Sequence, residues 1–295
     1  MKQNPEWNRE ALLESVIFHP MHPVITDLDS GVFPTLQTLN HLLERPIRSI
    51  KVKSGKPLRF VSQVGGKLPF ERQYEPRCYL EGVAPTRTNN WHDLFNALVW
   101  LTFPESKATI NARHYQALVN QDRVDQAEIV NDSQRGAVRD VNTLLDESGV
   151  IVVYSNAELA GLLRDFQWKE LFWHRREQVI ASMGFYIFGH GLYEKALQPY
   201  VGMTGQGLLL AVEPAFFSWP VSRRLAHLDA MLASHLDSSE NCRATHDLSP
   251  VPLLGIPGWT PDNENEQYYE NTEYFRPGRR SDKRTVRRNA NLARD

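Results

Sequence analysis

Cysteine is scarce in this chain, which has two among 295 residues, Cys78 and Cys242. They are far apart and in no paired spacing, so neither a disulfide framework nor a cysteine-type zinc site is expected, and a reducing compartment fits best. The first sixteen residues lack the apolar core of a secretory signal, and no stretch reaches the roughly 20 apolar residues of a membrane helix. These absences favour a cytoplasmic protein without a membrane partner.

Several sequence motifs of common enzymes are also missing. The chain has no GxGxxG after a strand and no GxxxxGK[ST] loop, so a nucleotide-binding loop is not indicated. A GxSxG nucleophile elbow and an HExxH zinc helix are absent as well. No bound organic cofactor is therefore expected from motifs.

The net charge of −2 hides an asymmetry. Residues 276–295 hold eight basic and two acidic residues, which leaves −8 on residues 1–275. A basic end of this kind is either a solvated extension without a partner or an arm that binds nucleic acid or an acidic protein. We therefore divide the chain into one globular domain, residues 1–275, and a basic, flexible tail, residues 276–295.

Hydrophobic periodicity predicts a helix-rich α+β domain with a few short strands and a central helical hairpin. Between residues 178 and 222 only Glu194, Lys195 and Glu213 are charged, so this segment should form the core. The expected helices cover residues 35–44, 91–103, 105–119, 134–147, 156–176 and 222–236, and the expected strands cover 58–64, 77–82 and 149–154.

Polar residues stand at unusual places on the two most buried of these helices. His92 and Asn96 are four residues apart and share a face, as do Asn111 and His114 at a spacing of three. An antiparallel hairpin about Pro104 would set Asn96 opposite Asn111 and His92 near His114. This cluster is either an internal hydrogen-bond network or a site in which His92 or His114 acts as base or metal ligand.

Further residues complete the candidate site. Asn96 and Asn111 would orient the base or the substrate, while Arg87 or Arg113 would bind an anionic group. Asn90 and Asp93 have a simpler explanation as an N-cap and its capping-box partner.

A second group of candidates lies in the charge-poor segment. His190 and Glu194 are spaced i,i+4, and Glu213 follows an apolar run. Three histidines with one carboxylate form an acceptable set for a catalytic zinc or iron, which gives His92, His114 and His190 with Glu194 or Glu213 as ligands of a divalent metal. Asp140, Asp146 and Glu147 could also bind a metal, although such charges are common on helix surfaces.

Three segments carry a resemblance to a known family. They are PTRTNNWHDLFNALVWLTFPESKATINARH (residues 85–114), GHGLYEKALQPYVG (189–202) and LLGIPGW (253–259). With these, the chain resembles the bacterial family called domain of unknown function 3025 over most of its length up to residue 276. The resemblance implies an intracellular, single-domain bacterial protein and implies no activity.

The hypothesis that best fits the residues is a hydrolase-type, metal-assisted enzyme acting on a small polar or anionic substrate. The alternative is a non-catalytic binding protein that uses the tail, residues 276–295, for nucleic acid or an acidic partner.

Overall fold

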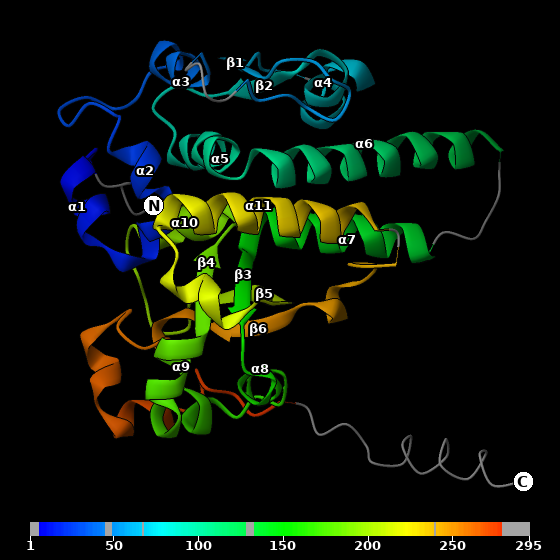
Figure 1. Cartoon of the computed structure of the whole chain (residues 1–295). Coiled ribbons are helices and arrows are strands. Elements are labelled where there is room, and N and C mark those ends of the chain that lie inside the picture. The colour runs from blue at the N-terminus through cyan, green and yellow to red at the C-terminus, as the bar shows by residue number, and fades with distance from the viewer. Residues whose placement is uncertain (1–5, 45–48, 67, 128–132, 239, 279–295) are drawn as a thin grey trace, which may run out of the picture.

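A computed structural model of the chain describes residues 6–44, 49–66, 68–127, 133–238 and 240–278, without the side chains of 121–127 and 133–135. Helices dominate these residues, and the strands form a two-stranded and a four-stranded sheet (Figure 1). The expected helix-rich α+β class is therefore confirmed. Of the basic tail, only residues 276–278 are described, and the rest of that prediction lies outside the described residues.

The small sheet forms an outer layer with two helices. Strands β1 (Arg59–Ser62) and β2 (Val83–Thr86) pair in parallel, and α3 (Leu36–Leu43) packs against β1. Asn40 of α3 accepts a hydrogen bond from the amide N–H of Phe60 and donates one to its carbonyl. The Asn40 side chain thereby satisfies backbone groups at the outer edge of β1, as a further strand would.

The strand expected at residues 77–82 is wrong, because these residues belong to helix α4 (Tyr74–Glu81). A period-two pattern over six residues does not separate a strand from a helix end. Gly82 ends the helix. It adopts a left-handed φ of 71°, and its N–H donates to the carbonyl of Cys78, which is a typical helix C-cap. The strand follows directly as β2.

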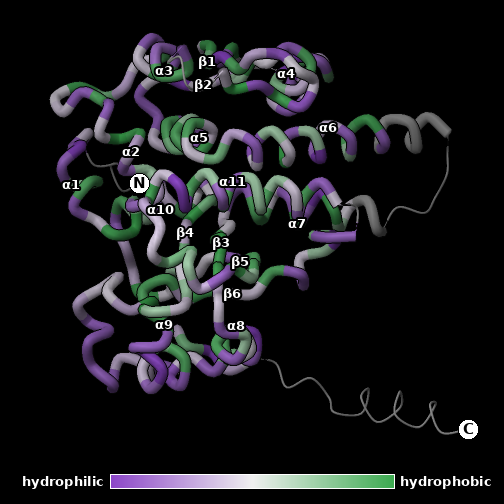
Figure 2. The backbone as a smooth tube through the Cα atoms, in the orientation of Figure 1, coloured by the Kyte–Doolittle hydropathy of each residue, from purple (hydrophilic) through white to green (hydrophobic). Residues whose placement is uncertain are grey.

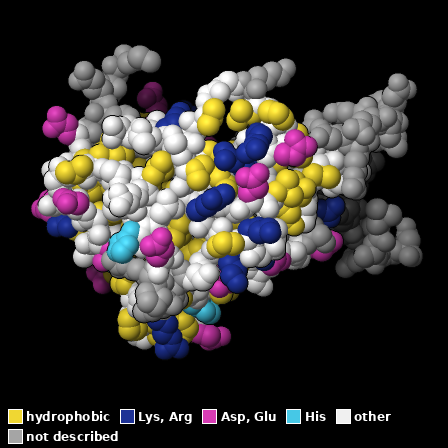
Figure 3. Space-filling model, turned by 90° about the horizontal axis from the view of Figure 1, so that it is seen from above, with side chains coloured by type: hydrophobic (Ala, Val, Ile, Leu, Met, Phe, Trp, Pro, Cys, Tyr) yellow, Lys and Arg dark blue, Asp and Glu magenta, His cyan; other side chains and the backbone are white. Residues whose placement is uncertain are grey.

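The outer layer presents positive charge. Lys51, Lys53, Lys56 and Arg59 are exposed, and the stretch from 49 to 59 has no acidic residue. Seen from above, Lys and Arg side chains gather on this face (Figure 3). Positive charge is thus not confined to the tail.

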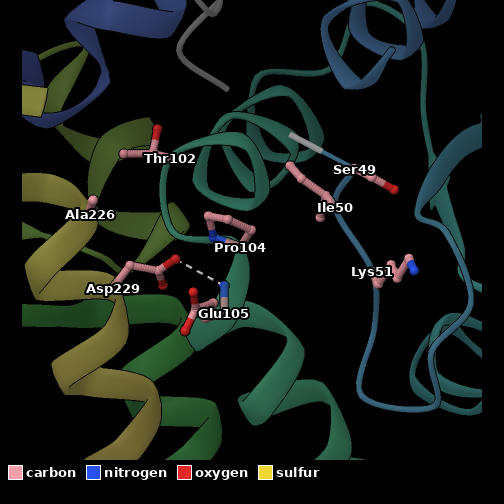
Figure 4. Close-up of a pocket in the computed structure, with 8 residues that line it drawn as sticks. All are labelled: Ser49, Ile50, Lys51, Thr102, Pro104, Glu105, Ala226 and Asp229. Carbon is pink, nitrogen blue, oxygen red and sulfur yellow. Dashed lines mark hydrogen bonds between the residues drawn. The ribbon is translucent and has the colours of Figure 1, made fainter. Parts of the chain in front are cut away.

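A layer of helices lies beneath the outer layer. It contains α5 (Trp91–Thr102), α6 (Pro104–Ala127), α7 (Ser133–Ser148) and α11 (Val221–Asp237). Helix α6 packs against α7 and α11. Asp229 of α11 accepts hydrogen bonds from the backbone N–H groups of Glu105 and Ser106, and Figure 4 shows the bond from Glu105. Asp229 therefore caps the start of α6, because Phe103, the residue before the helix, has no side-chain acceptor.

The expected break at Pro104 is present, but the antiparallel pairing of α5 with α6 is wrong. Only Phe103 separates the two helices, and a reversal of direction needs a loop of about two to five residues. Figure 1 shows α5 nearly end-on and α6 running across the view. The hairpin in this layer is formed by α6 and α7, whose first and last turns meet where Lys107 contacts Asp146.

The four-stranded sheet has the order β4-β3-β5-β6 and lies below the helical layer. Its central strand β3 (Gly149–Tyr154) pairs antiparallel with β4 (Met183–Ile187) and parallel with β5 (Thr204–Ala211). Strand β6 (Ser249–Pro252) pairs with β5 at the edge. Every residue of β3 except Tyr154 is buried, as its uninterrupted apolar sequence predicts.

Shorter helices complete the fold. Helices α8 (Ala157–Arg164) and α9 (Arg176–Ser182) connect β3 to β4, and α10 (His190–Ala196) follows β4 directly. Helices α1 (Arg9–Glu14) and α2 (His22–Ile25) form an N-terminal arm. Hydrophobic residues concentrate on α5 and the strands in the middle of the molecule (Figure 2). No helix among the described residues is long and apolar enough to cross a membrane.

Candidate metal centre

Two histidines and a glutamate from three different helices meet at one point. The Nε2 atoms of His92 and His190 lie 3.0 Å apart. Oε1 of Glu147 lies 3.8 Å from Nε2 of His92 and 3.5 Å from Nε2 of His190. Among the described residues these three form the one group of metal-ligating side chains whose ligand atoms all lie within 4.8 Å of one another.

Strand pairing explains why Glu147 and His190 meet. Glu147 is in the last turn of α7, just before β3, and His190 opens α10, just after β4. Because β3 and β4 are antiparallel, with Val150 opposite Ile187, the start of one lies beside the end of the other. The amide N–H groups of Phe188 and Gly189 both donate to the carbonyl of Gly149 and hold this junction closed.

Packing of α5 against α10 supplies the third residue. Asn90 is the N-cap of α5, as predicted, and accepts a hydrogen bond from the N–H of Asp93, which fixes the first turn that carries His92. His190 and Glu194 are one helical turn apart on α10, and the imidazole of His92 lies against both.

Each imidazole has a carboxylate on its other side. Nδ1 of His92 lies 3.0 Å from Oε2 of Glu194, and Nδ1 of His190 lies 3.6 Å from Oδ2 of Asp146. A carboxylate facing Nδ1 favours the tautomer that is protonated there, which leaves the lone pair on Nε2. Two lone pairs and the Glu147 carboxylate oxygen then lie within 3.8 Å of one another, so they repel unless a cation or a proton lies between them.

A buried lysine contacts Asp146, the carboxylate that faces His190. Nζ of Lys107 lies 2.6 Å from Oδ1 of Asp146, and the Lys107 side chain is 3% exposed. Burial acts to raise the pKa of Asp146, but the charges of Lys107 and His190 outweigh it and hold the pKa at about 2. Asp146 is therefore ionised at neutral pH, and its charge faces Nδ1 of His190, which is buried and has no hydrogen-bond partner among the described residues.

The centre opens toward solvent on the side of Glu147. The side chain of Glu147 is 43% exposed and that of His92 is 30% exposed, whereas His190 is buried. When a proton rather than a cation lies between the ligand atoms, Nε2 of His190 donates to Glu147, and this hydrogen bond lowers the pKa of Glu147 against the burial that acts to raise it. Besides the histidines, the carboxylates of Asp146, Glu147 and Glu194 have cationic neighbours in Lys107, which contacts Asp146, and in Arg87, which lies near Glu194.

The other residues of the predicted hairpin pocket lie elsewhere. Asn96 donates to the hydroxyl of Tyr74, and Asn111 donates to the side-chain and main-chain oxygens of Glu75. His114 is buried, and its charge acts against the burial that raises the pKa of Glu75. We call these residues the α4 cluster: Tyr74, Glu75, Asn96, Asn111 and His114.

The physical reason for this division is the short α5–α6 connection. Without an antiparallel turn, Asn96 and Asn111 each face α4 instead of one another, and His92 faces α10. His114 is therefore separate from the group that His92 forms with His190 and Glu147, and the expectation of three histidines in one ligand set is not met among the described residues.

The predicted anion-binding arginines have different surroundings. Arg87 forms a two-pronged ion pair with Asp93 through Nε and Nη2, and it is close enough to Glu194 for that carboxylate to raise its pKa in addition. Arg113 instead donates to the carbonyls of Leu236, Asn241 and Cys242 and thereby holds the end of α11. Arg87 thus borders the centre, while Arg113 is held by main-chain carbonyls at the end of α11.

Two carboxylates also differ from expectation. Glu213 is exposed at the end of β5 and is not part of the group. Asp93 accepts from the backbone N–H of Arg87 rather than closing a capping box with Asn90. Glu194 does reach the centre, as a partner of His92.

The sequence indicates Asp146 and Glu147 as possible metal ligands but does not connect them with His92 and His190, and it does not indicate Lys107. The sequence signal for Asp146 and Glu147 was weak, because pairs of carboxylates are common at the ends of helices. Only the β3–β4 pairing, which brings the end of α7 to the start of α10, distinguishes Glu147 from other surface carboxylates.

Comparisons with known proteins agree with the resemblance noted in the sequence. Neither the curated proteins nor the solved structures contain a match to this chain. A family model described as "Protein of unknown function (DUF3025)" matches residues 58–279, a span that includes His92, Glu147, His190 and Glu194. The chain therefore belongs to the DUF3025 family, whose function is unknown.

Proposed function

We propose that this protein binds a divalent cation, with zinc the best fit, at His92, Glu147 and His190, and that it uses the cation in a hydrolytic reaction. The observation that carries this proposal is the triangle of ligand atoms. A point equidistant from atoms separated by 3.0, 3.5 and 3.8 Å lies about 2.0 Å from each, which is the length of zinc bonds to nitrogen and oxygen, ~2.0–2.2 Å.

The ligand set supports a catalytic rather than a structural role. Structural zinc sites are closed by four protein ligands, whereas catalytic sites use three, and two histidines with one glutamate are a known catalytic set. The fourth position would lie toward solvent, beside the exposed edge of Glu147. A cation held there supplies a bound water of lowered pKa and polarises a carbonyl or phosphoryl oxygen.

The surrounding residues suit this chemistry. Glu194 accepts a hydrogen bond from Nδ1 of His92 and orients that imidazole, as carboxylates behind the metal ligands do in many zinc proteins, and Asp146 faces Nδ1 of His190 at 3.6 Å. Lys107 keeps Asp146 ionised. The two extra negative charges at Glu147 and Glu194 match the charge of a divalent cation.

Arg87 supports the expected substrate class, which is small and polar or anionic. Its guanidinium is about half exposed and uses Nε and Nη2 for Asp93. The remaining N–H groups can bind a carboxylate or phosphate next to the cation.

Metal titration tests the proposal. The purified chain is stripped with a chelator and titrated with Zn²⁺, alongside His92→Ala, His190→Ala and Glu147→Gln. Each variant should lose more than about 100-fold in affinity, because even second-layer substitutions cost ~10–100-fold. His246→Ala and Glu213→Gln, which alter an exposed histidine and an exposed carboxylate, are the matched controls and should bind as the native chain does.

Hydrolysis is then measured with chromogenic carboxylic and phosphate esters. The proposal expects a rate that disappears with chelator, returns with Zn²⁺ and is absent in Glu147→Gln. Native protein that takes up no divalent cation, or variants that bind like the controls, would end the proposal.

A further inference from the structure

Gly191 stands where a glycine has no conformational reason to be. It is the second residue of α10, it is buried, and its φ is not among the positive values found at other glycines. In an ordinary helical position glycine is the least favourable residue after proline, and alanine is the best. A different requirement must therefore act on this position.

Space for Glu147 is that requirement. A Cβ atom on Gly191 would lie 2.5 Å from Oε2 of Glu147 and 3.0 Å from its carbonyl oxygen. The first distance is far below any ordinary contact, and the atom concerned is the tip of a side chain that can rotate away. The second contact needs the main chain to give by only a few tenths of an ångström.

Gly189, two residues earlier, makes a useful contrast. A Cβ there would lie 2.4 Å from the backbone nitrogens of both Ser148 and Gly149. Those atoms belong to the α7–β3 junction and cannot move without opening it, so Gly189 serves the fold. At Gly191 the closest atom is instead a carboxylate oxygen of the centre itself.

We propose that Gly191 is a positioning residue, which leaves the room that lets the Glu147 carboxylate turn toward the Nε2 atoms of His92 and His190. This inference rests on the proposed metal-binding function. The bare helix surface at Gly191 sets the direction of the carboxylate, and an added methyl group turns it away from the cation while α10 keeps its helical backbone.

Four proteins test this: the native chain, Gly191→Ala, Glu147→Asp and the double variant. Zn²⁺ affinity is measured by titration, and Co²⁺ absorption in the visible range reports ligand geometry. Gly191→Ala should lose about 10-fold to 100-fold in Zn²⁺ affinity, the range for residues that orient a ligand, and its Co²⁺ spectrum should change. Gly161→Ala, on α8 with nothing within 4 Å of the new Cβ, is the control and should leave both unchanged.

The double variant separates positioning from a general structural effect. Aspartate is one methylene shorter, so Glu147→Asp should weaken binding in the native background but not further in Gly191→Ala, where the shorter side chain relieves the clash. If Gly191→Ala does not fold, folding restored by Glu147→Asp supports the same contact, whereas two unfolded variants overturn the proposal. The proposal is also overturned if Gly191→Ala binds Zn²⁺ with native affinity, or if the fold-losses of the two single variants multiply in the double variant. A native chain that binds no Zn²⁺ refutes the proposed function, and this inference with it.

Discussion

Replacing Lys107 by methionine should be among the most destabilising single changes in this protein. The substitution keeps the length of the side chain and removes the ammonium that contacts Asp146 at 2.6 Å. Lys107 is buried and Asp146 is mostly shielded from solvent, with 3% and 13% of their side chains exposed. Methionine would leave the Asp146 carboxylate ionised in the interior without its main counter-charge.

The magnitude follows from the pKa of Asp146. Its pKa of about 2 compares with an ordinary value of 3.8, and each pH unit of such a difference corresponds to about 1.4 kcal/mol, which gives about 2.5 kcal/mol. This figure is net of the burial that opposes ionisation, so loss of Lys107 should cost more. Breaking a buried ion pair by removal of one partner costs about 3–5 kcal/mol, and we expect that range at pH 7.

The sign of the pH dependence is also fixed. Because the folded pKa of Asp146 lies below its unfolded value, the native stabilisation is present above pH ~4 and is lost as the pH falls toward 2. In Lys107→Met burial is no longer outweighed, so Asp146 should take up a proton at higher pH and the deficit against the native chain should shrink on acidification.

Urea unfolding in excess chelator measures the free energy of unfolding of Lys107→Met and of the native chain. The chelator ensures that no bound cation contributes to stability. Lys53→Met is the matched control, because its partner Asp237 is at nearly the same distance, 2.7 Å, but both side chains are exposed. The control should lose less than about 1 kcal/mol. If Lys107→Met loses no more than Lys53→Met, the reasoning about the buried charge is refuted.

Three further outcomes are expected. Asp229→Ala should destabilise the chain by about 2 kcal/mol in urea unfolding, because it uncaps the backbone N–H groups of Glu105 and Ser106. A loss below about 0.5 kcal/mol would contradict the capping role. Burial raises the pKa of Glu75 above its ordinary value of 4.5, so the folded chain should lose stability as the pH rises from 4.5 through that raised pKa. Glu75→Gln should remove this loss, and an unchanged pH profile of unfolding would speak against it. Truncation after Gly278 should leave Zn²⁺ affinity unchanged, and lower Zn²⁺ affinity would instead link the tail to the centre. If the tail binds nucleic acid, the same truncation should abolish a salt-dependent gel shift of DNA or RNA.

Local patterns in the sequence predicted much of the secondary structure. The helix expected at residues 35–44 is α3, Asn90 caps α5, Pro104 separates α5 from α6, and the apolar run of residues 149–154 is a buried strand. These features depend on neighbours within a few residues, which a sequence displays directly. The strand expected at residues 77–82 failed because its apolar alternation was too short to outweigh the C-cap at Gly82.

The candidate site was predictable only in part. His92, His190 and Glu194 could be named from composition and spacing, because histidines and a carboxylate are rare in apolar surroundings. Their partner Glu147 depends on the register of β3 with β4, which is set between residues about forty positions apart in the chain. The pairing of His92 with His114 failed because a single residue, Phe103, joins the two helices and does not let them fold back.

The central claim is that one cation is held by His92, Glu147 and His190. Anomalous X-ray scattering recorded on either side of the zinc absorption edge, from crystals of the chain grown with Zn²⁺, tests it most directly. We predict a peak about 2.1 Å from Nε2 of both histidines and from a Glu147 oxygen. A map with no peak there, with the two imidazoles joined by a direct hydrogen bond, would contradict the claim.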